Sequence, residues 1–294
     1  MPPAQRSQAE VRLPQGTIRY RDIGAGEPIV FLHGALVDGT LWRKVTPLLE
    51  GDFRCVLPDL PLGSHRVPMG ADADLSPPAL ARLVADLLAE LGLERVTLVG
   101  NDTGGAICQL VATRHPERLA RLVLTPCDAF ENFPPLAFKY LPITARIPGG
   151  MTLLTQSMRI GLVRRLPIAY GGLAKRPIAP QVVQSWVEPL IGDPAVRRDA
   201  GKVLRGMSSR YTLEAAERLR SLELPALIAW APEDRFFKLR DGERLAAAIP
   251  DSRLVEIPDA HTFVSEDQPE RLADAITRFM AETPQAPSAP PSGR

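Results

Sequence analysis

The first 126 residues alternate short apolar runs with segments whose apolar residues recur at helical spacing. Short apolar or alternating runs predict strands, at Thr17–Ile23, Pro28–Leu32, Phe53–Pro58, Arg95–Val99 and Leu119–Thr125. Helical spacing predicts helices, at Leu41–Leu49, Leu80–Leu91 and Ile107–Arg114. Because the two kinds of segment alternate, we expect an α/β fold with a mostly parallel central sheet and helices on both faces.

The alternation stops after residue 126 and returns after residue 210. Nine prolines between residues 127 and 210 divide that segment into short helices and turns, which is typical of an inserted helical lid. Strands are predicted again at Leu224–Ala231 and Arg253–Ile257, and helices at Leu239–Ile249 and Pro269–Met280. We therefore expect a core at 1–126 and 211–281, a helical lid (cap) at 127–210, and a disordered tail at 282–294.

Composition and charge exclude several classes of protein. The 294 residues carry 35 Lys and Arg against 34 Asp and Glu, and a net charge of +1 does not provide the basic surface of a general nucleic-acid binder. We see neither a signal peptide nor an apolar run long enough to span a membrane. The expected protein is cytoplasmic, with no membrane partner. Three cysteines form no disulfide framework and are expected to be buried thiols.

The turn Gly100-Asn101-Asp102-Thr103-Gly104-Gly105 carries the candidate chemistry, because it follows a predicted strand and precedes a predicted helix. Such a turn with flanking glycines presents its central side chain at the top of a sheet as a nucleophile. Here that side chain is Asp102. A carboxylate is ionised at pH 7 without an assisting base, and it can displace a leaving group from a saturated carbon to form an alkyl ester. The alternative is that Asp102 only caps the following helix.

The partners of Asp102 follow from the order nucleophile, acid, histidine that accompanies this turn. His261 is the only histidine after the predicted lid, and it is the candidate base that takes a proton from the attacking water. Asp234 follows a predicted strand and is the favoured acid to orient His261, with Asp128 as the alternative. The backbone N–H groups of Thr103 and Ala35 are the expected oxyanion hole.

Together these residues resemble the α/β-hydrolase superfamily. The motifs that carry the resemblance are FLHG (Phe31–Gly34), the GNDTGG turn, WAPED (Trp230–Asp234) and DAH (Asp259–His261), within a stretch of about residues 15–280. The resemblance implies an α/β-hydrolase fold with a lid. An Asp at the turn is similar to the branch that contains haloalkane dehalogenases, haloacetate dehalogenases and epoxide hydrolases.

The sequence departs from each pattern in that branch. Haloalkane dehalogenases usually have Trp directly after the nucleophile, where this chain has Thr103, and their second halide donor is often a lid Trp, for which Trp186 is the candidate. Epoxide hydrolases usually have His-Gly-x-Pro, whereas this chain has Leu36 in place of the proline. Their two lid tyrosines have candidates here in Tyr140 and Tyr170.

The resulting hypothesis is a hydrolase that opens a bond at an sp³ carbon through an Asp102 alkyl ester, with dehalogenation ranked above epoxide opening. A non-hydrolytic biosynthetic enzyme or a ligand-binding protein of the same fold is a further alternative. The expected partners are a small, largely apolar organic substrate and water. No ligand cluster for a metal is visible, and no cofactor is implied.

Overall fold

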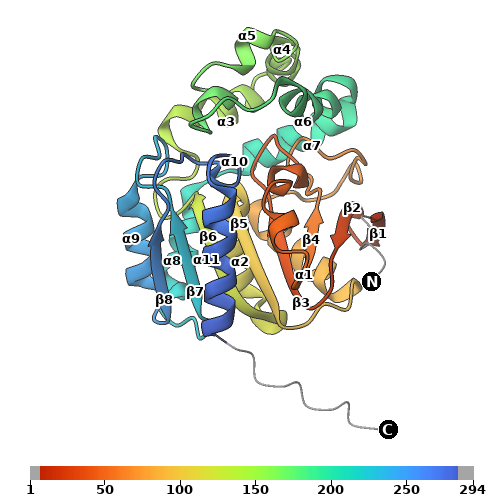
Figure 1. Cartoon of the computed structure of the whole chain (residues 1–294). Coiled ribbons are helices and arrows are strands. Elements are labelled where there is room, and N and C mark those ends of the chain that lie inside the picture. Colours follow the sequence, from red (N-terminus) through yellow and green to blue (C-terminus); the bar gives the residue numbers. More distant parts are fainter. Residues whose placement is uncertain (1–6, 284–294) are drawn as a thin grey trace, which may run out of the picture.

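The computed structural model describes residues 7–283, in which eight strands form one sheet in the order β1-β2-β4-β3-β5-β6-β7-β8 (Figure 1). The strands are β1 (Ser7–Leu13), β2 (Gly16–Ile23), β3 (Glu27–Leu32), β4 (Phe53–Pro58), β5 (Val96–Asp102), β6 (Leu119–Cys127), β7 (Ala226–Trp230) and β8 (Ser252–Glu256). Strand β2 pairs antiparallel with β1 and β4, and the remaining neighbours pair in parallel. The predicted mostly parallel sheet is confirmed.

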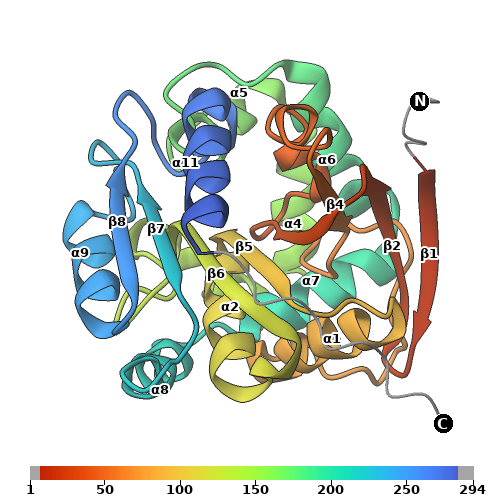
Figure 2. The same ribbon diagram turned by 60° about the horizontal axis from the view of Figure 1, so that its bottom comes forward.

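Helices cover both faces of the sheet (Figure 2). One face packs against α1 (Pro77–Glu90), α2 (Thr103–Arg114), α8 (Ser209–Leu219) and α9 (Leu239–Ala248), and the other packs against α11 (Pro269–Glu282). The alternation of side chains along each strand produces this arrangement. In β3, Val30 and Leu32 join the first core, whereas Ile29 and Phe31 join the second.

Between β6 and α8 the chain forms short helices that lie over the edge of the sheet where the parallel strands end (Figure 1). They are η4 (Leu136–Phe138), α3 (Tyr140–Arg146), α4 (Gly150–Ser157), α5 (Gly161–Arg164), η5 (Tyr170–Gly172), α6 (Pro180–Gly192) and α7 (Pro194–Gly206). We call residues 136–206 the cap. The cap lies inside the predicted lid segment of 127–210, because Cys127 still belongs to β6 and α8 packs against α2.

Two short segments differ from the sequence prediction. The helix predicted at Leu41–Leu49 is replaced by the 3₁₀ turns η1 (Gly39–Trp42) and η2 (Thr46–Leu48). Pro47 lacks the N–H that would continue an α-helical hydrogen-bond ladder, so the apolar residues of this segment pack from two short turns instead of one helix. Strand β1 was not predicted, because its alternating, largely polar residues form an antiparallel edge. The elements η3 (Pro116–Arg118) and α10 (Val264–Asp267) complete the described secondary structure.

Other predictions concern burial, membranes and the C-terminus. All three cysteines are buried and unpaired. No helix within residues 7–283 is both long enough and apolar enough to cross a bilayer. The predicted tail at 282–294 lies outside the described residues except for Glu282, which ends α11, and Thr283.

Candidate active site

Asp102 is the last residue of β5 and immediately precedes α2. Its backbone has φ 53° and ψ −130°, a conformation that is strained for residues other than glycine. The neighbouring glycines make room for the turn: a Cβ on Gly104 would lie 2.5 Å from the Leu32 carbonyl oxygen. A Cβ on Gly105 would lie 2.3 Å from Cys127 Cβ. The crowding explains why small residues occupy these positions.

The carboxylate of Asp102 is held by two backbone N–H groups. The Ala35 N–H donates to Oδ2 over 3.1 Å, and the Thr103 N–H also hydrogen-bonds to the carboxylate and lowers its pKa. Both donors of the predicted oxyanion hole therefore face Asp102. Gly34 makes this approach possible, since a Cβ there would lie 2.1 Å from Oδ2.

Burial changes the acidity of Asp102. The surrounding protein removes much of its hydration, which raises the pKa of Asp102 to about 7. The sequence-based expectation of a fully ionised carboxylate at neutral pH therefore does not hold in this structure. Asp128, 1% exposed, accepts a hydrogen bond from Thr103 Oγ1 over 3.2 Å. Burial and the nearby charge of Asp102 raise the pKa of Asp128 well above its usual value.

Asp234 lies in the loop after β7 and is 2% exposed. Its Oδ1 accepts hydrogen bonds from the backbone N–H groups of Phe236 (2.7 Å) and Phe237 (2.9 Å). Burial raises the pKa of Asp234 to about 6. The hydroxyl of Thr262 faces this carboxylate and lowers its pKa, although neither Asp234 Oδ2 nor Thr262 Oγ1 completes a hydrogen bond of normal geometry.

The imidazole of His261 lies apart from the predicted triad partners. Among residues 7–283, no hydrogen bond joins it to Asp102, Asp128 or Asp234, and its buried Nδ1 has no partner. The ring lies near the carbonyl of Ala174 in the cap. Its pKa is lowered, first by burial and then by the positive charge of Arg235. The structure thus brings Thr262, rather than His261, to the carboxylate of Asp234.

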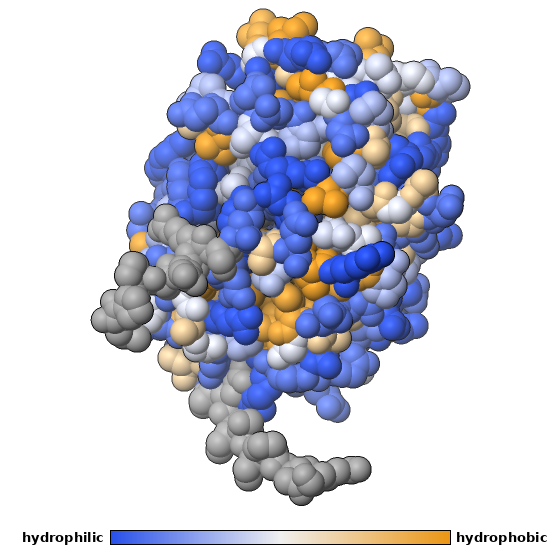
Figure 3. Space-filling view, turned by 90° about the vertical axis from the view of Figure 1, so that its right-hand side faces the viewer, coloured by the Kyte–Doolittle hydropathy of each residue, from blue (hydrophilic) through white to orange (hydrophobic). Residues whose placement is uncertain are grey.

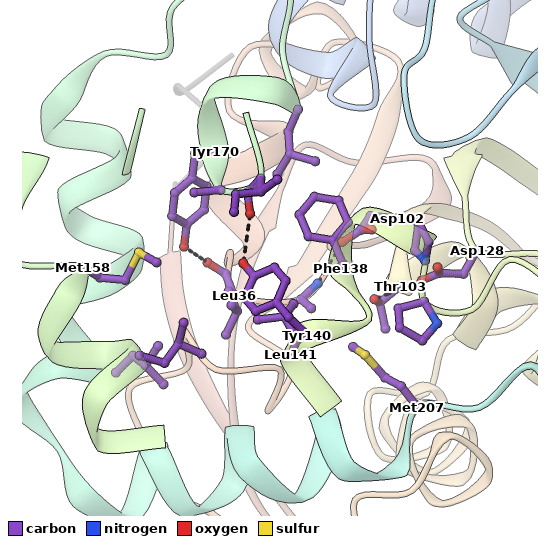
Figure 4. A pocket seen from close by; sticks show the side chains of 18 residues that line it. Leu36, Asp102, Thr103, Asp128, Phe138, Tyr140, Leu141, Met158, Tyr170 and Met207 are labelled. Carbon is purple, nitrogen blue, oxygen red and sulfur yellow. Dashed lines mark hydrogen bonds between the residues drawn. The ribbon is translucent and has the colours of Figure 1, made fainter. Parts of the chain in front are cut away.

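A small cavity of about 70 Å³ lies between Asp102 and the cap (Figure 4). Its walls are mainly apolar and include Leu36, Phe138, Leu141, Leu154, Met158 and Met207. Thr103, Asp128 and Asp102 supply the polar side chains of its floor. Pockets for drug-sized ligands occupy roughly 300–1,000 Å³, so this cavity is small by comparison.

The two predicted cap tyrosines line this cavity, and the predicted cap tryptophan does not. Tyr170 Oη donates to the carbonyl of Leu36 over 2.6 Å, and Tyr140 Oη donates to the carbonyl of Ile168 over 2.9 Å (Figure 4). Trp186 is fully buried, and its indole N–H donates to Thr40 Oγ1 over 2.7 Å.

His33, near the site, has a structural role. His33 accepts a hydrogen bond from the Leu60 N–H on Nε2 over 2.8 Å, which fixes the loop that presents Ala35. Burial lowers the pKa of His33 to about 4, so it stays neutral. Within the described part of the chain, no group of His, Cys, Asp or Glu side chains is arranged to hold a metal ion.

Sequence reasoning missed two residues at the site. Nothing in the sequence indicates that Thr262 faces Asp234, because that contact depends on how the loop turns. The steric role of Gly34 depends on a partner distant in sequence, Asp102. Neither contact leaves a signal in the local pattern.

A strained Asp between a parallel strand and a helix, beneath a helical cap, is the arrangement expected of the α/β-hydrolase fold. A family model described as alpha/beta hydrolase fold matches residues 27–269, and the chain belongs to this family. Haloalkane dehalogenase 2 of Mycobacterium tuberculosis is 30% identical over 276 residues, which cover 89% of this chain and 91% of the relative.

Two further proteins are similar over most of the chain. The cis-3-alkyl-4-alkyloxetan-2-one decarboxylase of Shewanella oneidensis is 27% identical over 284 residues, which cover 90% of this chain and 86% of that protein. The solved structure of an alpha/beta hydrolase fold protein from Burkholderia ambifaria has a TM-score of 0.77 at 23% identity, and it covers 92% of this chain and 97% of its own. The chain thus has haloalkane dehalogenase-like homologues within a hydrolase family.

Proposed function

We propose that this protein opens a bond at a saturated carbon of a small apolar molecule through a covalent ester on Asp102. The observation that supports this most directly is the carboxylate itself, which faces an apolar cavity and is held on Oδ2 by the Ala35 N–H. A carboxylate in this position serves as the nucleophile without a base to activate it. The haloalkane dehalogenase-like homologues agree with chemistry at such a carbon.

In the first step Oδ1 of Asp102 attacks the carbon, and the carbon–oxygen bond of the ester forms as the carbon–leaving-group bond breaks. The electron pair of the broken bond leaves with a halide, or stays on an epoxide oxygen that takes up a proton. In the second step water adds to the ester carbonyl. The Ala35 N–H, which binds Oδ2, stabilises the negative charge that develops there, and the Thr103 N–H, which binds the same carboxylate, assists it. Collapse of this intermediate releases the alcohol and restores Asp102.

The leaving group is better matched by an epoxide oxygen than by a halide, which reverses the order favoured by the sequence. Tyr140 and Tyr170 line the cavity, and their phenol hydroxyls can protonate an oxygen once they leave the carbonyls of Ile168 and Leu36 that they bind in this structure. Trp186 does not line the cavity, and its indole N–H donates to Thr40. Dehalogenation remains the second candidate, because the relative that is 30% identical over most of the chain is named a haloalkane dehalogenase.

The water step is assigned to His261 with Asp234, as the sequence predicts. In this structure the His261 ring lies against the cap near Ala174, so the step requires the ring to turn toward Asp102. We expect this rearrangement to limit the rate of hydrolysis, so that the ester forms faster than it is hydrolysed. The ester should then accumulate even in the unmodified protein.

Intact-mass measurement tests the proposal. The unmodified protein and the His261→Gln variant are incubated with panels of epoxides and alkyl halides, with Asp102→Ala as the control. An epoxide substrate adds its whole mass, whereas a halide substrate adds only its alkyl group. Peptide mapping should locate either adduct on Asp102. The covalent mechanism is wrong if no adduct forms with any compound and Asp102→Ala retains turnover. Saturable binding without adduct or turnover would favour the ligand-binding alternative.

A further inference from the structure

The cap carries nearly all the exposed large hydrophobic side chains of the described chain. Ten such side chains are exposed within residues 7–283, and all but Leu48 and Leu213 lie between Leu136 and Ile168. The end of the cap at α4 and α5 contributes Leu153 (75% exposed) and Leu162 (73% exposed). This end stands farthest from the sheet (Figure 1). Exposed apolar groups gathered on one segment indicate an interaction surface.

The same segment is strongly basic. Residues 132–187 contain no Asp or Glu and seven cations, at Lys139, Arg146, Arg159, Arg164, Arg165, Lys175 and Arg176. Over the whole cap, residues 136–206, eleven Lys and Arg against three Asp and Glu give a net charge of +8, so the rest of the chain carries −7. The near-neutral composition therefore conceals a basic cap on an acidic body. In Figure 3, orange apolar side chains at the top of the molecule stand beside blue polar ones.

A cleft of about 510 Å³ lies beside the apolar end of the cap. Four basic side chains line it, at Arg164, Arg165, Lys175 and Arg176. Lys175 pairs with Glu233 and Asp259, and Arg176 pairs with Asp259, so these two cations are partly neutralised. Arg164 bonds only the neutral amide of Gln184, and Arg165 is an exposed cation at the end of α5. These two arginines keep their charge available for an anion.

We propose that the end of the cap, residues Leu153–Arg165, binds the surface of a bilayer that contains anionic phospholipids. Leu153, Ile160 and Leu162 would enter the acyl region, while Arg159, Arg164 and Arg165 contact the phosphate groups. Apolar side chains flanked by cations are the combination that holds a helix in the interfacial plane of a membrane. Pairing of two caps is disfavoured because it would bring like charges together.

The position of the catalytic cavity is consistent with such a surface. Helix α4 places Leu154 on the cavity wall and Leu153 on the outside. Tyr170 lines both the cavity and the basic cleft. A lipophilic substrate dissolved in the bilayer would thus enter the cavity past one helix. This last point rests on the proposed function, whereas binding to the bilayer does not.

The sequence predicts no membrane partner because it has no segment that could span a bilayer, but binding to the surface of a bilayer needs no such segment. Vesicle flotation tests it without any measurement of activity. The protein should float with vesicles of equal parts phosphatidylglycerol and phosphatidylcholine, and remain behind with phosphatidylcholine alone. Binding should weaken when the salt rises from about 0.1 M to about 1 M, because the Debye length falls from about 10 Å to about 3 Å.

Two variants separate the apolar and the charged contributions. Leu153→Ser with Leu162→Ser should lower the vesicle partition coefficient by about tenfold or more. Arg159→Gln with Arg164→Gln and Arg165→Gln should lower it by at least about tenfold on anionic vesicles. The matched controls are Leu48→Ser with Leu213→Ser, and Arg82→Gln with Arg220→Gln and Arg240→Gln, which lie outside the cap and should bind normally. Circular dichroism checks that each variant is folded.

Three outcomes would overturn the proposal. The first is equal binding, or none, to anionic and neutral vesicles. The second is loss of binding in the control variants to the same extent as in the cap variants. The third is a concentration-dependent dimer in analytical ultracentrifugation that Leu153→Ser with Leu162→Ser abolishes, which would assign the surface to a second copy of the chain.

Discussion

Gly34 and Asp102 are in contact so close that no side chain fits between them. A Cβ at Gly34 would lie 2.1 Å from Asp102 Oδ2 and 2.6 Å from Asp102 Cβ. The Ala35 N–H reaches the carboxylate because the preceding residue has no side chain. Gly34 therefore helps to position the candidate nucleophile.

Gly34→Ala should slow ester formation at least about a hundredfold, because the added methyl displaces a group that must be held within a fraction of an ångström. The rate of adduct formation, followed by intact mass, measures the effect. Gly51→Ala is the matched control, since its Cβ would meet nothing within 4 Å. Equal rates in both variants would show that Gly34 does not position Asp102.

The rate of ester formation should rise with pH and level off above a midpoint near 7. Burial raises the pKa of Asp102 to about 7, and only the ionised carboxylate attacks carbon. Below the midpoint the rate should fall about tenfold for each pH unit, as protonation removes the nucleophile. Single-turnover adduct formation from pH 5 to 9 measures this. A rate that does not change between pH 5 and 8 would contradict the raised pKa.

The same pKa shift predicts a stability effect. Asp102 binds its proton more tightly when folded than when unfolded, so between about pH 4 and 7 the folded state holds more protons. The free energy of unfolding should therefore fall as the pH rises through this range. Asp102→Asn removes the titrating group, and its stability advantage over the unmodified protein should grow from pH 4 to pH 7 in urea titrations.

Asp234→Asn should lower turnover by about a hundredfold or more, in the range expected for loss of general-base catalysis, and should leave ester formation intact. Asp128→Asn should change turnover by less than about threefold, because Asp128 is held by Thr103 and the raised pKa of its carboxyl disfavours the charged form that would orient a histidine. Burst and steady-state kinetics distinguish the two phases. The reverse result would move the role of the acid to Asp128.

Asp102→Gly should be more stable than Asp102→Ala by about 1 kcal/mol. Both variants remove the buried carboxylate, but the backbone at φ 53° is strained only for alanine. Urea denaturation of the two variants gives the difference directly. An equal or lower stability for the glycine variant would show that the turn stores no strain at this residue.

The strands and the candidate nucleophile could be predicted from sequence because their signals are local. Phe53–Pro58 is an apolar run and forms β4 with the same bounds, and glycines flank Asp102 within three residues. The direction of the His261 side chain could not be predicted. It depends on the course of a loop in which Asp259 has φ 63° and the Thr262 carbonyl accepts from Asn101. The net charge of the chain likewise did not indicate a basic cap, because it adds the charges of surfaces that lie far apart.

The crowding at the turn after β5 limits which positions around the cavity can be substituted. A larger side chain at Gly104 or Gly105 would displace backbone or neighbouring atoms. Substitution of either glycine should therefore disturb the turn that carries Asp102. The cavity ceiling is supplied by cap side chains such as Leu154 and Met158, which also pack against the hydrophobic core. Substitutions in the cap can therefore reshape the cavity without moving the backbone around Asp102, whereas a side chain at Gly104 or Gly105 cannot be added without moving it.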